Sequence, residues 1–167
     1  MDSNDPVCSG LFSQVLTFSS FGFMPVFSTP IFVTLTNNRF LYGKHDIGLS
    51  LRDNEQLGAH SDLLCFGFKK NHSSVTISRY IWSHPELKPF GNPLPIQCPD
   101  CKGLQTWTVL KSTANNIYLK CKGIDCSRWL DFSRAPALNF FLGRYVDDGW
   151  HGQWLKEVLS SETLSIN

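Results

Sequence analysis

Charged residues are scarce in this 167-residue chain, and none lies between Asp5 and Arg39. Asp, Glu, Lys and Arg make up 17% of the sequence and leave a formal net charge of +1, which gives no overall attraction to nucleic acid or to an anionic membrane. The uncharged segment is apolar, but Pro25, Pro30 and many hydroxyl side chains argue against a membrane-spanning helix, which needs about 20 largely apolar residues. We expect short buried strands there, at Gln14–Phe18 and Ile31–Thr36, or an apolar surface that contacts a partner.

We expect no secretion signal. The first ten residues carry acidic rather than basic side chains, and no small-residue cleavage site follows an uninterrupted apolar run. We therefore expect a reducing intracellular compartment, the nucleus or the cytoplasm, where clustered cysteines hold metal more often than they form disulfides.

Catalytic signatures such as H-E-x-x-H or a nucleophile elbow are absent from the sequence. Two pairs of His and carboxylate residues remain, His45 with Asp46 and His60 with Asp62. They are candidates for divalent-metal binding or acid–base chemistry in a metal-dependent hydrolase or nuclease. Because no catalytic spacing accompanies them, solvated loop residues or capping groups are the simpler interpretation, and our expectation leans toward a protein that is not an enzyme.

The cysteines, by contrast, are grouped. Four of the six form two close pairs, Cys98 with Cys101 (C-x2-C) and Cys121 with Cys126 (C-x4-C), and 19 residues separate the pairs. This spacing is typical of a four-thiolate zinc site, because each short gap lets a turn direct two sulfurs at one ion about 2.3 Å away. Two disulfides are the alternative. We expect one structural Zn²⁺ per chain, with all four positions around the ion filled by sulfur.

Short strands are predicted around the two cysteine pairs. β-branched and aromatic residues favour strands at Leu104–Leu110, Ile117–Cys121 and Arg128–Phe132. Gly103 and Gly123 lie in the two turns, where we expect the backbone to need glycine's freedom. Three strands closed by two cysteine turns make a zinc ribbon, whose small sheet depends on the metal for its stability.

The segment 98–132 contains C-P-x-C, a strand pair, and C-x4-C followed by an aromatic residue. In this it resembles the C-terminal zinc ribbons of type IA DNA topoisomerases. The matching positions are Cys98, Pro99, Cys101, Cys121, Cys126 and Trp129. The resemblance implies a zinc-ribbon fold and, by analogy, contact with single-stranded DNA through exposed aromatic side chains of the sheet. Nothing in the rest of the chain resembles a topoisomerase core.

Candidate nucleic-acid-binding residues lie in the same segment. The resemblance implies that three aromatic residues stack on bases: Trp107, Tyr118 and Trp129. Basic residues near the cysteines are candidates for contact with phosphates: Lys120, Lys122 and Arg128. The alternative is that these basic side chains neutralise the negative charge of the metal-bound sulfurs, since residues 98–134 contain six basic and three acidic side chains.

A β-hairpin is predicted before the cysteines. Apolar runs at Asp62–Lys70 and Val75–Trp82 flank four turn-forming residues. Alternation in the second run places Ile81 on a core face and Tyr80 and Trp82 on a partly exposed face. The residues that follow, 83–97, contain four prolines and predict an extended connector.

The C-terminal segment is predicted to be helical. Pro136–Leu142 has a proline near its first turn and a glycine after its end, and Trp150–Glu162 places Trp154, Leu155 and Val158 on one apolar face. The whole pattern therefore predicts an α+β fold: a mostly antiparallel β-sheet region with an integrated four-cysteine zinc ribbon and one or two C-terminal helices. The expected division is a β-rich region at 1–97, the ribbon at 98–134 and the helical segment at 135–167.

The function expected from these residues is that of a zinc-binding module with a structural four-cysteine site, which binds nucleic acid through the aromatic and basic residues of the ribbon. Two alternatives stay open: a hydrolase or nuclease that uses the His and Asp residues, and a module that docks on a protein partner in a larger assembly. No association with a membrane is expected.

Overall fold

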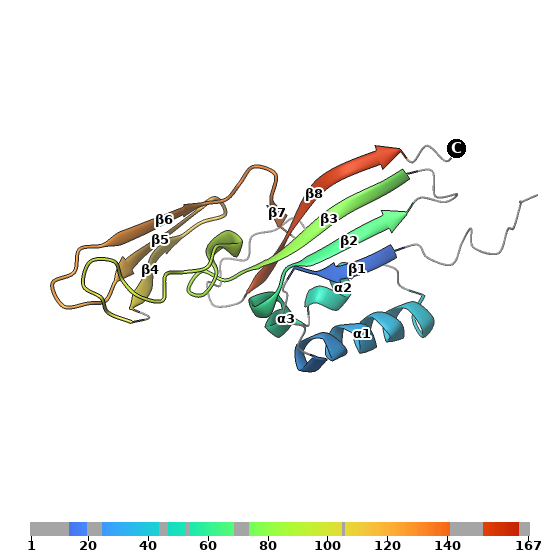
Figure 1. Ribbon diagram of the computed structural model, residues 1–167, viewed down its shortest axis with the longest axis horizontal. Coiled ribbons are helices and arrows are strands. Elements are labelled where there is room, and N and C mark those ends of the chain that lie inside the picture. Colours follow the sequence, from blue (N-terminus) through green and yellow to red (C-terminus); the bar gives the residue numbers. More distant parts are fainter. Residues whose placement is uncertain are drawn as a thin grey trace, which may run out of the picture.

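Two antiparallel sheets make up the framework of the molecule in the computed structural model, which describes residues 14–19, 25–43, 47–52, 54–68, 74–104, 106–140 and 152–163. The larger sheet has the strand order β1-β2-β3-β8-β7 and the smaller one β4-β5-β6. Figure 1 shows the small sheet at one end of the long axis and the larger sheet at the other. The strands of the larger sheet are β1 (Gln14–Phe18), β2 (Leu63–Phe68), β3 (Ser74–Ser83), β7 (Asn139–Phe140) and β8 (Gln153–Thr163). Those of the smaller sheet are β4 (Trp107–Ser112), β5 (Asn116–Cys121) and β6 (Trp129–Ser133).

Three helices, α1 (Pro25–Phe40), α2 (Ile47–Arg52) and α3 (Glu55–His60), cover one face of the larger sheet (Figure 1). The fold is therefore a β-rich α+β fold, as the sequence predicts. Between the helices and the sheet lies the first core, defined by nine buried residues: Ile31, Ile47, Leu51, Leu57, Leu63, Cys65, Tyr80, Trp82 and Trp154. The strand predicted at Gln14–Phe18 is confirmed as β1. Leu16 and Phe18, at alternate positions of this strand, pack against the first core.

The strand predicted at Ile31–Thr36 is wrong, because this segment lies within helix α1. Pro25 occupies the first helical position, where its missing N–H costs nothing, and Ile31 is 1% exposed in the first core. The Thr34 hydroxyl donates to the Pro30 carbonyl at 2.9 Å within the helix. Burial of one helix face against the sheet therefore outweighs the strand preference of the β-branched residues.

The predicted hairpin is confirmed, since β2 and β3 pair antiparallel from Leu63 with Tyr80 to Phe68 with Val75. The assignment of its faces is wrong. Tyr80 and Trp82 are 5% and 4% exposed because the helical layer covers the face predicted to be partly exposed. Ile81 on the opposite face is buried as well, but in the second core.

The predicted C-terminal helices are wrong where the structure describes them. Asn139 and Phe140 form β7 within the first predicted helix, and residues 153–162 of the second belong to β8, which pairs with β3 along its length. The apolar spacing of Trp154, Leu155 and Val158 fits a helix, but Trp154 and Leu155 point to opposite faces of the sheet and both are buried. Two buried faces remove the alternation that normally identifies a strand. Residues 141–151 lie outside the described part of the chain.

The second core joins the two sheets. It contains Ile81, Phe90, Cys98, Trp107, Ile117, Leu119, Cys121, Leu138 and Leu155. The proline-rich connector contributes Phe90 from the short 3₁₀ helix η2 (Pro89–Gly91), so the connector packs between the sheets. Two of the four clustered cysteines are therefore core residues.

Among the helices of the described residues, none combines the length and the apolar character that crossing a membrane requires.

Candidate metal centre

The four cysteines of the two predicted pairs come together at one point. Their Sγ atoms all lie within 4.8 Å of one another. Two of the separations join one pair to the other: 3.5 Å from Cys101 to Cys121 and 3.8 Å from Cys98 to Cys126. These distances are well beyond a disulfide bond of about 2.05 Å, so the sulfurs are thiols that could together hold a metal ion.

Each pair is held in a backbone turn. In the first turn the Cys98 N–H donates to the Gly103 carbonyl at 2.9 Å and the Lys102 N–H donates to the Cys98 carbonyl at 3.0 Å. In the second, the Cys121 N–H donates to Arg128 O at 3.0 Å and the Cys126 N–H to Gly123 O at 3.1 Å. These bonds direct the sulfurs of each pair inward.

The two turn glycines are required for space rather than for unusual backbone angles, which corrects the expectation from the sequence. The positive φ angles in these turns occur at Lys102 (60°) and Asp125 (58°). A Cβ atom at Gly123 would lie 2.7 Å from Cys101 Sγ, and one at Gly103 would lie 3.0 Å from a methyl carbon of Thr106. A side chain at Gly123 would therefore displace a sulfur.

Polar donors stabilise the thiolate form of Cys121. The Thr106 hydroxyl lies 3.1 Å from Cys121 Sγ, and the Gly123 N–H donates to the same sulfur at 3.3 Å. These hydrogen bonds lower the pKa of the Cys121 thiol to about 6. Sequence reasoning missed Thr106, because its position beside the sulfur depends on the pairing of β4 with β5.

The crowding of four sulfurs has the opposite effect on Cys126. A hydrogen bond from the backbone of Arg128 lowers the pKa of the Cys126 thiol, but burial and the neighbouring thiols outweigh it and raise this pKa to about 12. Four thiolates at this spacing need a cation among them to offset their mutual repulsion.

The cluster is buried on one side and accessible on the other. Cys98 and Cys121 are 0% and 3% exposed and belong to the second core, whereas Cys101 is exposed and Cys126 is half-buried. Cys65 lies apart, in the first core, where burial raises the pKa of its thiol. It is a small core side chain and not part of the cluster.

The candidate nucleic-acid-binding residues fall into two groups. Trp107 is 7% exposed, lies in the second core and donates from Nε1 to the Pro95 carbonyl at 2.8 Å, so its ring offers no open face for stacking on a base. Lys120 pairs across the sheet with Trp129, which is 57% exposed, and Tyr118 lies two residues from Lys120 on the same face. We call the face with Tyr118, Lys120 and Trp129 the outer face of the small sheet. Lys122 and Arg128 are exposed at its cysteine end.

The structure describes only two residues of the proposed His and Asp cluster, His60 and Asp62. Asp62 is buried and accepts hydrogen bonds from Arg79 and Lys88, with Lys88 Nζ at 2.9 Å. Its carboxylate thus links β3, the connector and the loop before β2, and it is committed to a structural role. His60 ends helix α3, and His45 and Asp46 lie outside the described residues.

Four clustered thiols are therefore the strongest chemical feature of the described chain. No family model matches the sequence, and neither a curated protein nor a solved structure shows significant similarity to it.

Proposed function

We propose that this chain is a zinc-binding module in which one Zn²⁺, bound by Cys98, Cys101, Cys121 and Cys126, has a structural role. The observation that carries the proposal is the convergence of four sulfurs from two separate turns to within 4.8 Å of one another. In an ideal tetrahedron with zinc–sulfur bonds of about 2.3 Å, neighbouring sulfurs are about 3.8 Å apart. The separations of 3.5 Å between Cys101 and Cys121 and 3.8 Å between Cys98 and Cys126 are close to that spacing.

A structural rather than catalytic role follows from the ligand set. Four cysteines fill the tetrahedron, so no position is left for a water molecule or a substrate. Binding by such sites releases about 10–16 kcal/mol in small zinc-finger peptides, which is comparable to the entire stability of a domain. Because Cys98 and Cys121 are also core residues, this free energy acts directly on the contact between the two sheets.

The arrangement also supports the zinc-ribbon hypothesis for residues 98–132. The three antiparallel strands β4, β5 and β6 carry one cysteine turn before β4 and another between β5 and β6. This order of turns and strands is the one that the sequence pattern predicts for a zinc ribbon. The resemblance of segment 98–132 to the zinc ribbons of type IA DNA topoisomerases remains part of this hypothesis.

Replacement of zinc by Co²⁺ tests the site directly. The full chain should bind one equivalent of Co²⁺ with the strong visible absorption of a tetrahedral ion and the near-ultraviolet bands of several thiolate ligands, and Zn²⁺ should remove both. Weak bands typical of six-coordinate cobalt, or binding that Zn²⁺ does not displace, would refute a four-thiolate site.

Gly123→Ala sharpens this test because the added methyl group lies 2.7 Å from Cys101 Sγ. We expect metal affinity to fall by about 10- to 100-fold, as when the groups that support metal ligands are altered. Gly67→Ala is the control, since its nearest neighbour is a backbone oxygen at 3.8 Å in the other sheet. Equal metal affinity in both variants would contradict the proposed geometry.

A second candidate function is the binding of single-stranded nucleic acid on the outer face of the small sheet. It is favoured by the adjacency of Trp129, Lys120 and Tyr118, which combines two aromatic rings with a cation on one sheet face. Stacking of a base on an aromatic side chain contributes about 1–3 kcal/mol. Trp107 is not part of this surface.

Titration of the chain with single- and double-stranded oligonucleotides at several salt concentrations tests this second function. We expect binding to the single strand that weakens with salt and is reduced by about tenfold or more in Trp129→Ala. Absence of binding even at low salt would exclude it and would leave the zinc site unaffected.

A further inference from the structure

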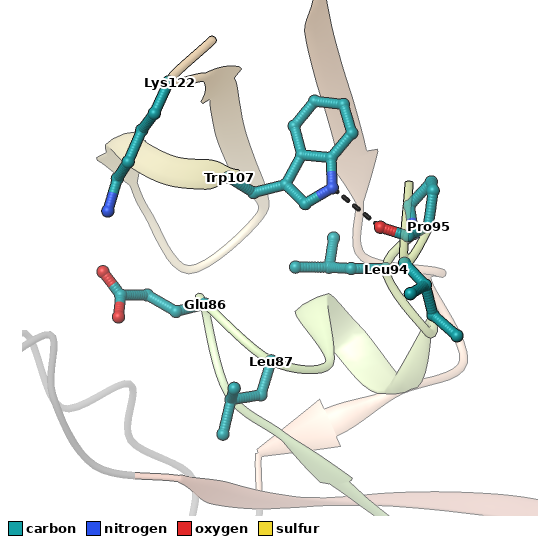
Figure 2. Close-up of a pocket in the computed structure, with 7 residues that line it drawn as sticks. Glu86, Leu87, Leu94, Pro95, Trp107 and Lys122 are labelled. Carbon is teal, nitrogen blue, oxygen red and sulfur yellow. Dashed lines mark hydrogen bonds between the residues drawn. The ribbon is translucent and has the colours of Figure 1, made fainter. Parts of the chain in front are cut away.

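A groove of about 400 Å³ lies between the connector and the small sheet. Its volume falls in the range of small-molecule sites, which is about 300–1,000 Å³. Figure 2 shows the groove with side chains of both regions around it. The lining residues are Glu86, Leu87, Leu94, Pro95, Ile96, Trp107 and Lys122.

Apolar side chains form part of the wall of the groove. Trp107 already donates its indole N–H to the Pro95 carbonyl, so it offers only carbon atoms to the groove (Figure 2). Leu94 packs against the second core beside it. Leu87 and Ile96 also line the groove and are 61% and 72% exposed, so an apolar ligand can cover them.

Two side chains of opposite charge, Glu86 and Lys122, lie at one end of the groove. Figure 2 shows the Glu86 carboxylate and the Lys122 ammonium group on the same side, with Glu86 coming from the connector and Lys122 from the small sheet. Among the described residues no ion pair joins them, and neither side chain has another charged or hydrogen-bonding partner. The backbone positions are fixed: the Glu86 N–H donates to His84 Nδ1 at 3.1 Å and the Lys122 N–H donates to the Thr106 carbonyl.

We propose that this groove binds an apolar α-amino acid in its zwitterionic form. Its ammonium group pairs with Glu86, its carboxylate pairs with Lys122, and its side chain contacts Leu94 and the small exposed part of Trp107. This class of ligand satisfies both charges at one end and carries its apolar part on the same carbon atom, which matches the order of groups along the groove.

Ligands of other classes leave one of these groups without a complement. A phosphate or a simple carboxylate pairs with Lys122 but meets the negative charge of Glu86, and an amine has the reverse problem. A hydrocarbon fills the apolar part but removes water from both charges without replacing it. The zwitterion is the smallest ligand that avoids each of these costs.

The test is an NMR titration of the full chain, observed at the indole N–H of Trp107, with L-leucine and L-phenylalanine as probes. Three further probes each lack one feature of leucine: isopentylamine lacks the carboxylate, 4-methylpentanoate lacks the ammonium group, and glycine lacks the side chain. We expect saturable shifts with leucine and phenylalanine, and at least about threefold weaker binding of the other three. No shift with leucine, or equal affinity for 4-methylpentanoate, would overturn the proposal.

Two charge variants test whether Glu86 binds the ammonium group of the ligand and Lys122 binds its carboxylate. Glu86→Gln should weaken the binding of leucine about threefold or more but should not weaken the binding of 4-methylpentanoate, because it also removes a repulsive charge. Lys122→Gln should likewise weaken the binding of leucine but not that of isopentylamine. Lys111→Gln, which removes an exposed charge on β4 outside the groove, is the matched control and should bind leucine as the wild type does. If Lys111→Gln and Lys122→Gln lower the affinity for leucine equally, the effect reflects net charge and the proposed site is wrong. None of these outcomes depends on binding of nucleic acid.

Discussion

The two cores of this protein differ in what fills them. The first core, between the helices and the larger sheet, consists of aliphatic and aromatic side chains with one isolated thiol, Cys65. The second core, between the sheets, includes Cys98 and Cys121, and Cys126 packs against it. Burial of apolar surface alone can hold the first core together, whereas the second places several thiols where only a metal ion makes their proximity favourable. The two regions should therefore respond differently to the same kind of change.

Loss of one metal ligand is the largest expected effect. Cys121→Ser removes a thiolate from the site, so metal should be lost and the small sheet should unfold, at a cost on the order of 10 kcal/mol of binding free energy. Cys65→Ser changes a cysteine of equal burial in the first core and should retain one zinc per chain. Elemental analysis of the two purified variants measures this, and equal metal loss in both would contradict the assignment.

The next largest effect is expected from a cavity in each core, to which the two cores should respond differently. Leu57→Ala in α3 and Leu119→Ala in β5 each remove a nearly fully buried leucine side chain, which costs about 2–5 kcal/mol of unfolding free energy. Only the second substitution lies in the core that contains the cysteines, so only Leu119→Ala should also lower zinc affinity. Denaturant titrations with a parallel zinc-affinity measurement compare them. A fall in zinc affinity with Leu57→Ala would mean that the cores are not independent.

A smaller effect is expected at the buried carboxylate. Asp62→Asn removes charge-assisted hydrogen bonds from Arg79 and Lys88, at a cost of about 1–3 kcal/mol, without loss of zinc. Glu157→Gln is the control, because Glu157 lies 4.0 Å from Arg79, whose side chain is 41% exposed, and its loss should change stability by less than about 0.5 kcal/mol. If Asp62→Asn is as stable as the wild type in thermal unfolding, the Asp62 network has no structural role.

The smallest effect on stability is expected on the outer face. Trp129 is 57% exposed, so Trp129→Ala should change the unfolding free energy by no more than about 0.5 kcal/mol while reducing binding to single-stranded DNA. A large loss of stability, measured by denaturant titration, would show that Trp129 is a packing residue.

Local patterns in the sequence predict the elements whose structure does not depend on contacts with distant parts of the chain. The β2–β3 hairpin and the strands around the cysteines have turn residues and β-branched residues that favour one structure. The cysteine spacing predicts the cluster because two cysteine pairs with short gaps are typical of a four-thiolate metal site.

The errors lie where contacts from distant parts of the chain decide the outcome. Segment 31–36 has strand propensity, yet it is helical because Ile31 is buried against a sheet whose strands come later in the sequence. The last strand, β8, has helical spacing of its apolar residues because Trp154 and Leu155 enter different cores on its two faces. The prediction that Trp107 stacks on a base is wrong, because its indole N–H donates to the Pro95 carbonyl and nothing in the sequence places these two groups together.

Hydrogen exchange with and without a zinc chelator tests the central claim most directly. We expect amides of β5, the middle strand of the small sheet, to lose protection when zinc is removed, while those of β2 and β3 in the larger sheet keep theirs. Unchanged protection of β5 in protein shown to be free of metal would contradict the account.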